Sequence, residues 1–436
     1  MHITRKIAKI DTTNKLTIAF DVSKDTLNYY SELKGKVSSN NFSEMQSIED
    51  SIGNRTKSIT KALHMLSSFS REQGFSGLHI VCEPTGNYST ALMRVSHRLG
   101  YSTAYISGEN VHKAKVIENH DGSKNDIKDA RVIYMLSKIG KELIYRDLPP
   151  HYKALRELNR MYDAADDRRV QMKCELHHLL KRLFCDFPMS PDWIYTKSGR
   201  VLMAEYRFSP YCIVADSYRK FCTKMRSHVP RIFISTLKKL YTYSRYSAQH
   251  CYSAAEVEVL EQHINHVWDE YCRAHDQRES LREQIASVYR GLRDTGEPLP
   301  VADGKVFKEF HFGRILGETG PLLDFAHWRV LFKYGGLNLR TRQSGRYKGK
   351  VKLSKKGRIY LRLILGKMIF RFVRHCDIFG EYYHRRKEKD PTIAGAKIMA
   401  NLERKLLRMV YAMAKRQESF NNARYRVCES QYSKAA

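Results

Sequence analysis

The sequence has no long apolar run and little that would suit a secreted or membrane protein. No uninterrupted apolar stretch reaches the roughly 18 residues that a membrane-spanning helix needs. The chain begins with MHITRKIAKIDTTNK, which is too polar for a secretory signal peptide. The nine cysteines are scattered without a CxxC pair, so no disulfide framework is indicated. We therefore expect an intracellular, cytoplasmic protein without a membrane partner.

Acidic residues are scarce relative to basic ones. The 436 residues include 46 Asp and Glu against 76 Lys and Arg, which gives a net charge of +30 and a pI near 9.7. Such an excess attracts a polyanion, usually DNA or RNA; a basic surface that only keeps the protein soluble is the alternative. Hydrophobic residues make up 42%, enough for cores in the two or three domains that this length suggests.

Residues 1–148 alternate between strand and helix patterns. Two short apolar runs are each followed by an acid, since Leu16–Phe20 precedes Asp21 and Leu78–Cys82 precedes Glu83. Strands and helices in alternation predict an α/β layer fold. A third strand is expected at Tyr101–Ile106, with helices that include Thr90–Leu99 and Asp126–Ile139.

Residues 149–300 change to a helical pattern. Charged residues alternate with apolar ones at helical spacing in Lys153–Phe184 and Ala254–Tyr289. Long antiparallel helices that form a coiled-coil arm are the simplest interpretation. Residues 186–252, rich in Tyr, Ser, Arg and Pro, look like an insertion into this arm, and no role is assigned to them. Residues 301–436 predict a compact, mainly helical domain with one very basic loop.

Four residues near the end of the first arm helix form a loose cluster that could hold zinc: Cys174, His177, His178 and Cys185. Their spacing matches no zinc module, so packing between helices is the favoured interpretation. Whether they bind a metal stays open.

Four acidic residues form the most informative pattern. Asp21 and Glu83 end or follow strands, at a sheet edge where active sites of open α/β folds gather. Asp126 and Asp129 are spaced i, i+3, so both carboxylates lie on one helical face. Four converging carboxylates repel one another unless a cation binds, and oxygen ligands suit Mg²⁺ or Mn²⁺. Each acid alone is more simply a helix cap or an ion-pair partner; the set indicates a metal site that acts on a phosphodiester.

Three short sequence motifs contain these acids. In chain order they are Asp21-Val22-Ser23-Lys24, Glu83-Pro84-Thr85-Gly86-Asn87-Tyr88, and Lys124-Asn125-Asp126 with Asp129-Ala130-Arg131. They resemble the insertion-sequence-110 family of transposases, which includes the Piv-type DNA invertases. The resemblance implies an N-terminal RuvC-like domain of ribonuclease H fold over residues 1–148. In that family the acidic set is D-E-D-D, which corresponds here to Asp21, Glu83, Asp126 and Asp129. Ala19-Phe20 departs mildly from the family's usual Gly-Ile.

The segment Arg340–Arg362 is very basic, with ten Lys or Arg and no acid. Further motifs lie in this segment and just before it. Phe332–Leu337, Gln343-Ser344-Gly345 and Leu353–Gly357 resemble the transposase domain of the same family. By that resemblance, Ser344 corresponds to the nucleophilic serine of the family. Ser354 lies in a second motif, whose serine is not the nucleophile. The residues expected to bind DNA are Arg342, Arg346, Lys348, Lys350, Lys355 and Lys356. From this segment alone, a flexible loop that only binds phosphate is the simpler interpretation; the acidic set favours the nucleophile.

The resemblance implies a DNA transposase or site-specific recombinase. Ser344 would attack a DNA phosphate and form a phosphoserine at a composite site that the metal-binding acids complete. Relatives assemble as dimers and tetramers and use a structured bridge RNA to choose donor and target DNA. We therefore expect donor DNA, target DNA, a guide RNA and further copies of this chain as partners, in association with a prokaryotic nucleoid. The alternative is a RuvC-like nuclease or junction resolvase in which metal-activated water attacks.

One motif of the family is missing. Relatives usually carry PGIG, a helix-hairpin-helix motif, before the transposase motif, whereas this chain has GKVFKEFHF at Gly304–Phe312. The resemblance resumes at Gly313–Gly320. The resemblance therefore does not imply a hairpin contact with DNA at this segment.

Overall fold

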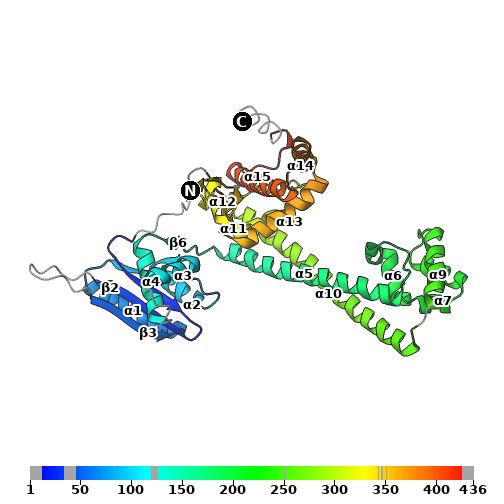
Figure 1. Ribbon diagram of the computed structural model, residues 1–436, viewed down its shortest axis with the longest axis horizontal. Coiled ribbons are helices and arrows are strands. Elements are labelled where there is room, and N and C mark those ends of the chain that lie inside the picture. Colours follow the sequence, from blue (N-terminus) through cyan, green and yellow to red (C-terminus); the bar gives the residue numbers. More distant parts are fainter. Residues whose placement is uncertain are drawn as a thin grey trace, which may run out of the picture. The chain divides into compact units, whose positions relative to one another are not determined.

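The computed structural model describes residues 12–33, 46–118, 126–249, 252–341, 343–344, 347–349 and 351–424. For residues 46, 116–118, 126–127, 343–344 and 347–348 it describes the backbone only. The chain forms two compact units, residues 1–148 and 149–436, each of which is described by itself (Figure 1). The predicted boundary near residue 300, inside the second unit, stays a prediction.

The first unit contains a six-stranded mixed sheet. Its strands are β1 (Lys15–Val22), β2 (Thr26–Leu33), β3 (Gln46–Gly53), β4 (Gly77–Cys82), β5 (Ser102–Ile106) and β6 (Glu142–Ile144). They lie in the order β3-β2-β1-β4-β5-β6; the pairs β1–β4 and β4–β5 are parallel, and the other pairs are antiparallel. The predicted α/β layer is confirmed, and the three predicted strands lie in β1, β4 and β5.

Helices cover both faces of this sheet. They are α1 (Thr56–Glu72), α2 (Thr90–Arg98), α3 (Gly108–Glu118) and α4 (Asp126–Lys138). Because side chains alternate along a strand, Leu16, Ile18 and Phe20 of β1 pack into a core with α1 and α2. Ala19 points the other way, into a core with α3 and α4. Burial on both faces explains why β1 is an almost continuous apolar run.

The second unit is built around two long helices, α5 (Pro150–Leu183) and α10 (Ala254–Asp294), which run side by side (Figure 1). Their ion pairs show that they are antiparallel. Asp166 contacts Arg278, whereas Glu175, further along α5, contacts His263, which comes earlier in α10. The predicted pair of long antiparallel helices is confirmed, while its supercoiling into a coiled coil stays a prediction.

Within the predicted insertion, residues 186–249 form a helical bundle at one end of α5 and α10 (Figure 1). Its elements are η1 (Pro191–Tyr195), α6 (Lys197–Tyr206), α7 (Pro210–Ala215), α8 (Tyr218–His228) and α9 (Ile234–Gln249). Leu202 and Leu240 are fully buried in a core that Leu179 of α5 and Ile264 of α10 complete. The bundle therefore packs around one hydrophobic core that it shares with the adjoining ends of α5 and α10.

The rest of the second unit is helical, with a short β ribbon. Its elements are α11 (Glu309–Thr319), η2 (Leu322–Asp324), α12 (Trp328–Gly335), β7 (Leu339–Arg340), β8 (Gln343–Ser344), β9 (Tyr347–Lys348), β10 (Lys352–Leu353), α13 (Ile359–His375), α14 (Asp377–Lys389) and α15 (Gly395–Arg416). Gly317 lets α11 approach α5 closely, since a Cβ there would lie 2.6 Å from Asn159 Nδ2 and 2.9 Å from the Leu155 backbone. None of the helices in the described ranges is both long and apolar enough to cross a membrane.

Candidate catalytic site

Asp21 and Glu83 stand at the ends of neighbouring parallel strands. In the register of β1 and β4, Phe20 pairs with Cys82, so the acids that come next lie side by side at the carboxyl edge of the sheet. Two residues before Asp21, Ala19 faces the core with α3 and α4. By alternation Asp21 points toward the same face, and both acids are partly buried.

Asp129 comes to this face from α4. Its neighbour Ala130 is fully buried in the core shared with β1. Lys115 of α3 donates a hydrogen bond from Nζ to Asp129 Oδ2 at 2.6 Å, and the two side chains are 38% and 15% exposed. Asp126, the fourth acid, starts α4, and its side chain is outside the described set.

The carboxyl of Glu83 is electrostatically coupled to this pair. Burial raises the pKa of Glu83 above its ordinary value; Lys115 lowers it and Asp129 raises it. Gly108, at the start of α3, packs against Glu83, because a Cβ there would overlap Oε1 and lie 3.2 Å from Cδ. A side chain at residue 108 would therefore displace the Glu83 carboxylate.

Asn54 ties together the loops that follow the two strands. Its Nδ2 donates to the carbonyl oxygens of Ser23, at 2.9 Å, and Tyr88, at 3.1 Å. Asn54, Lys115 and Gly108 were not predicted from the sequence. Each acts through residues that are distant along the chain, so no local pattern marks it.

The donor set suits a hard divalent cation. Carboxylate oxygens are the ligands that Mg²⁺ and Mn²⁺ take. The Lys115 ammonium already places a positive charge beside Asp129, and it opposes part of the rise that burial causes in the pKa of Glu83. Within the described side chains, which leave out Asp126, no three Asp, Glu, His or Cys groups are close enough to hold a metal.

Ser344 is the last residue of β8, in the β ribbon that replaces the predicted basic loop. β7 pairs with β10 and β8 with β9, and in the second pair Ser344 is opposite Tyr347. The backbone of Ser344 therefore lies in an antiparallel strand pair within the most basic segment of the chain. The predicted contacts Arg342, Arg346 and Lys350 fall outside the described residues, as does the side chain of Lys348.

Ser354 holds the base of this ribbon. Its hydroxyl lies 2.7 Å from Asn338 Oδ1 and its backbone N–H donates to the Asn338 carbonyl at 2.8 Å. The predicted DNA contacts Lys355 and Lys356 follow at once and are exposed. The hydroxyl of Ser354 is thus engaged in local structure, while the adjacent ammonium groups face solvent.

A buried carboxylate anchors the segment that follows. Glu318, at the end of α11, is fully buried and accepts from Arg358 Nε at 2.7 Å. Arg160 of α5 lies 3.1 Å from the same carboxylate, and the Tyr334 hydroxyl donates to the Glu318 carbonyl at 2.8 Å. These bonds fix the start of α13, and with it the base of the ribbon, against α5 and α11.

The cluster Cys174, His177, His178 and Cys185, for which helix packing was the favoured interpretation, shows no metal-binding arrangement among the described residues. Cys174, His178 and Cys185 are exposed. His177 Nε2 lies 3.2 Å from the Tyr195 hydroxyl of η1, and burial lowers the pKa of this histidine. No group of three metal-capable side chains is found here among the described residues.

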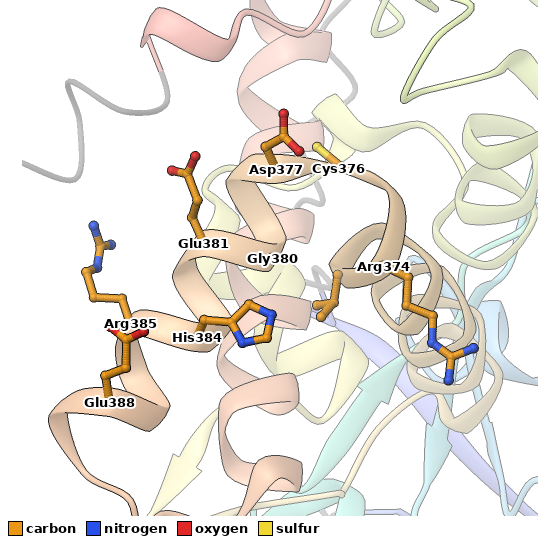
Figure 2. Close-up of a pocket in the computed structure, with 9 residues that line it drawn as sticks. Arg374, Cys376, Asp377, Gly380, Glu381, His384, Arg385 and Glu388 are labelled. Carbon is orange, nitrogen blue, oxygen red and sulfur yellow. The ribbon is translucent and has the colours of Figure 1, made fainter.

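A hollow of about 620 Å³ lies along α13 and α14. Figure 2 shows Asp377, Glu381 and Glu388 spaced along α14, and Arg374 on α13. Arg374, His384 and Arg385 also line the hollow, so the charge of its wall is mixed.

Two family models match parts of this chain. Residues 37–185 match a DEDD-type model of the IS110 group described as a transposase, and residues 309–384 match the model described as the transposase IS116/IS110/IS902 family. The first match includes Glu83 and Asp129 but begins after Asp21, and the second includes Ser344. No curated protein matches the chain.

One similar solved structure is titled "Thermus thermophilus RuvC structure". It shares 10% identity, covers 29% of this chain and 98% of its own, and has a TM-score of 0.21. The family models together match about half of the chain. The chain therefore belongs to the IS110 family of transposases and is an enzyme that acts on DNA in transposition or recombination.

Proposed function

We propose that this transposase cuts and rejoins DNA through a phosphoserine intermediate at Ser344, assisted by a metal ion on the four acids of the first unit. The observation that carries the proposal is the register of β1 and β4, which sets Asp21 beside Glu83. Asp129 and the cationic Lys115 lie on the helical layer that covers the same face. Such a layout favours a site that binds positive charge next to a polyanionic substrate.

Asp21, Glu83, Asp126 and Asp129 would hold Mg²⁺ or Mn²⁺. When bound, the ion polarises a phosphodiester and stabilises charge on the attacking and leaving oxygens. Gly108 keeps the Glu83 carboxylate in place, and Asn54 holds the two loops beside it. Lys115 donates a hydrogen bond to Asp129 and lowers the pKa of Glu83, against the burial that raises it.

Ser344 would act as the nucleophile. Its Oγ forms a bond to phosphorus as the bond from phosphorus to the 3′ oxygen breaks, and the hydroxyl proton ends on the departing 3′ oxygen. Attack of a different 3′ hydroxyl on the phosphoserine reverses the step and joins new strands. Lys355 and Lys356, together with the cations of the ribbon, would bind the DNA backbone and favour the charged transition state.

A covalent trap tests this assignment. The purified protein is incubated with Mg²⁺ and DNA that carries the ends of its element, and covalent protein–DNA adducts are resolved on denaturing gels. We expect an adduct with the wild type and with Ser354→Ala, and none with Ser344→Ala. An adduct that persists in Ser344→Ala contradicts the serine assignment. Cleavage without any adduct, abolished by Asp129→Asn, would identify a nuclease that uses water instead.

The same proposal includes a RuvC-like fold for the first unit, a guide RNA, and dimers that pair into tetramers on DNA. These rest on membership of the family and on the +30 charge, which suits RNA as well as DNA. Recombination by purified protein should depend on RNA that copurifies with it. Nuclease removal of that RNA should stop recombination, and adding it back should restore activity; unchanged activity after removal contradicts RNA guidance.

A further inference from the structure

The helical bundle of α6 to α9 is strongly basic, although it is far in sequence from the acids and from the serine. Residues 197–249 contain 11 Lys or Arg and two acids, Glu205 and Asp216. Both acids pair with lysines of α8, Asp216 with Lys220 at 2.5 Å and Glu205 with Lys224 at 2.7 Å. The positive charge on the other helices of the bundle is therefore not balanced from within it.

One face of α9 collects this charge. Lys238, Lys239 and Arg245 are exposed, whereas Leu237 and Leu240 on the opposite face are buried in the bundle core. Throughout the part of the chain that the structure describes, no ion pair joins these three cations to an acid. The buried face fixes the helix, so the cations are presented on a rigid surface.

Aromatic rings lie among these cations. Tyr243 and Tyr246 are 40% and 54% exposed, with ring centroids 6.1 Å apart and planes at 83°. They lie four and seven residues after Lys239 and thus on the same side of the helix. Phe233, just before α9, is 77% exposed. Tyr243 and Tyr246 therefore present ring surface to solvent beside the cations.

We propose that this face of α9 binds single-stranded nucleic acid. Lysine and arginine attract the phosphates, and an exposed tyrosine ring offers a flat surface on which an unpaired base stacks. In a duplex the bases are stacked inside, so the rings add nothing to duplex binding. The charge disfavours a basic protein partner, including a second copy of this face. The α9 face is far in sequence from the catalytic residues. The binding of nucleic acid proposed for it does not depend on the mechanism proposed above.

Binding to the full chain tests the proposal, without metal so that no cleavage occurs. Fluorescence anisotropy is measured with a 20-nucleotide uridine RNA, a 20-nucleotide thymidine DNA and a 20-base-pair duplex, across a series of salt concentrations. For Tyr243→Ala/Tyr246→Ala we expect about tenfold weaker single-strand binding with unchanged salt dependence. For Lys238→Gln/Lys239→Gln the slope of log K against log salt should fall in magnitude by about 1.4, or about 0.7 per phosphate contact.

Lys220→Gln/Lys224→Gln is the matched control, because it removes the same charge from α8, where acids already neutralise it. This variant should keep the wild-type slope. Photocrosslinking of a 5-iodouridine RNA should place adducts on Tyr243 or Tyr246, and the DNA arm shows whether the face prefers RNA. Equal losses with single strands and duplex, or no loss with either, overturn the proposal. So does a changed oligomeric state with unchanged oligonucleotide binding, which would make α9 a protein interface.

Discussion

Replacing Lys115 by Gln should tighten metal binding at the acidic site. The Lys115 ammonium donates to Asp129 at 2.6 Å, so a divalent cation has to displace it or bind beside it. Charge-assisted hydrogen bonds contribute about 1.5–3 kcal/mol. Because Lys115 is 38% exposed, solvent screening reduces this to about 1 kcal/mol. We therefore expect about fivefold tighter Mn²⁺ binding in Lys115→Gln.

Electron paramagnetic resonance of free Mn²⁺ measures this affinity directly. The titration is done at about pH 8, where carboxylates are ionised. Lys115 lowers the pKa of Glu83, so at acid pH its removal would favour the protonated carboxyl and weaken Mn²⁺ binding. Lys113→Gln is the matched control, since Lys113 pairs with Glu109 on the same helix at 2.6 Å. Its Mn²⁺ affinity should equal that of the wild type.

Thermal unfolding supplies a second readout for Lys115→Gln. Without metal, the variant leaves Asp129 and Glu83 to repel each other, so its Tm should be lower than that of the wild type. Added Mn²⁺ should raise Tm by more in the variant, because tighter binding stabilises the native state further. Unchanged or weaker Mn²⁺ binding refutes this reasoning. No Mn²⁺ binding by the wild type would instead refute the metal site itself, which Asp129→Asn tests separately.

Three other substitutions follow from the packing. Gly108→Ala should displace the Glu83 carboxylate and weaken Mn²⁺ binding by about tenfold, whereas Gly291→Ala, which meets open space in α10, should leave it unchanged. Gly291→Ala should also raise the free energy of unfolding by about 0.5–1 kcal/mol in urea titrations. Burial lowers the pKa of His311 to about 3, while in the unfolded chain it is about 6.5. The stability that depends on neutral His311 should therefore be fully present above pH 6.5 and fall by about 1.4 kcal/mol per pH unit from there down to about pH 3. His311→Gln should remove this part of the pH dependence. Equal pH slopes in both proteins would contradict the His311 assignment.

The sequence alone determined the α/β layer, the long helix pair and the positions of the acids. These features have local signals. β1 and β4 are buried on both faces and so read as apolar runs that end at Asp21 and Glu83. α5 and α10 carry the helical period over many turns. Among the strands that were not predicted, β2 and β3 read TLNYYSEL and QSIEDSIG, whose polar residues hide the strand pattern.

Tertiary structure alone decided which strands are neighbours and what surrounds the acids. Only the pairing of β1 with β4 puts Asp21 beside Glu83, since another strand order would separate them. Lys115 and Gly108 gain their roles through contacts between helices and strands that no local spacing encodes. The same holds for the basic segment, because ladder pairing of Ser344 with Tyr347 turns an expected loop into a ribbon. Periodicity is a property of neighbours in the chain, whereas a site is a property of neighbours in space.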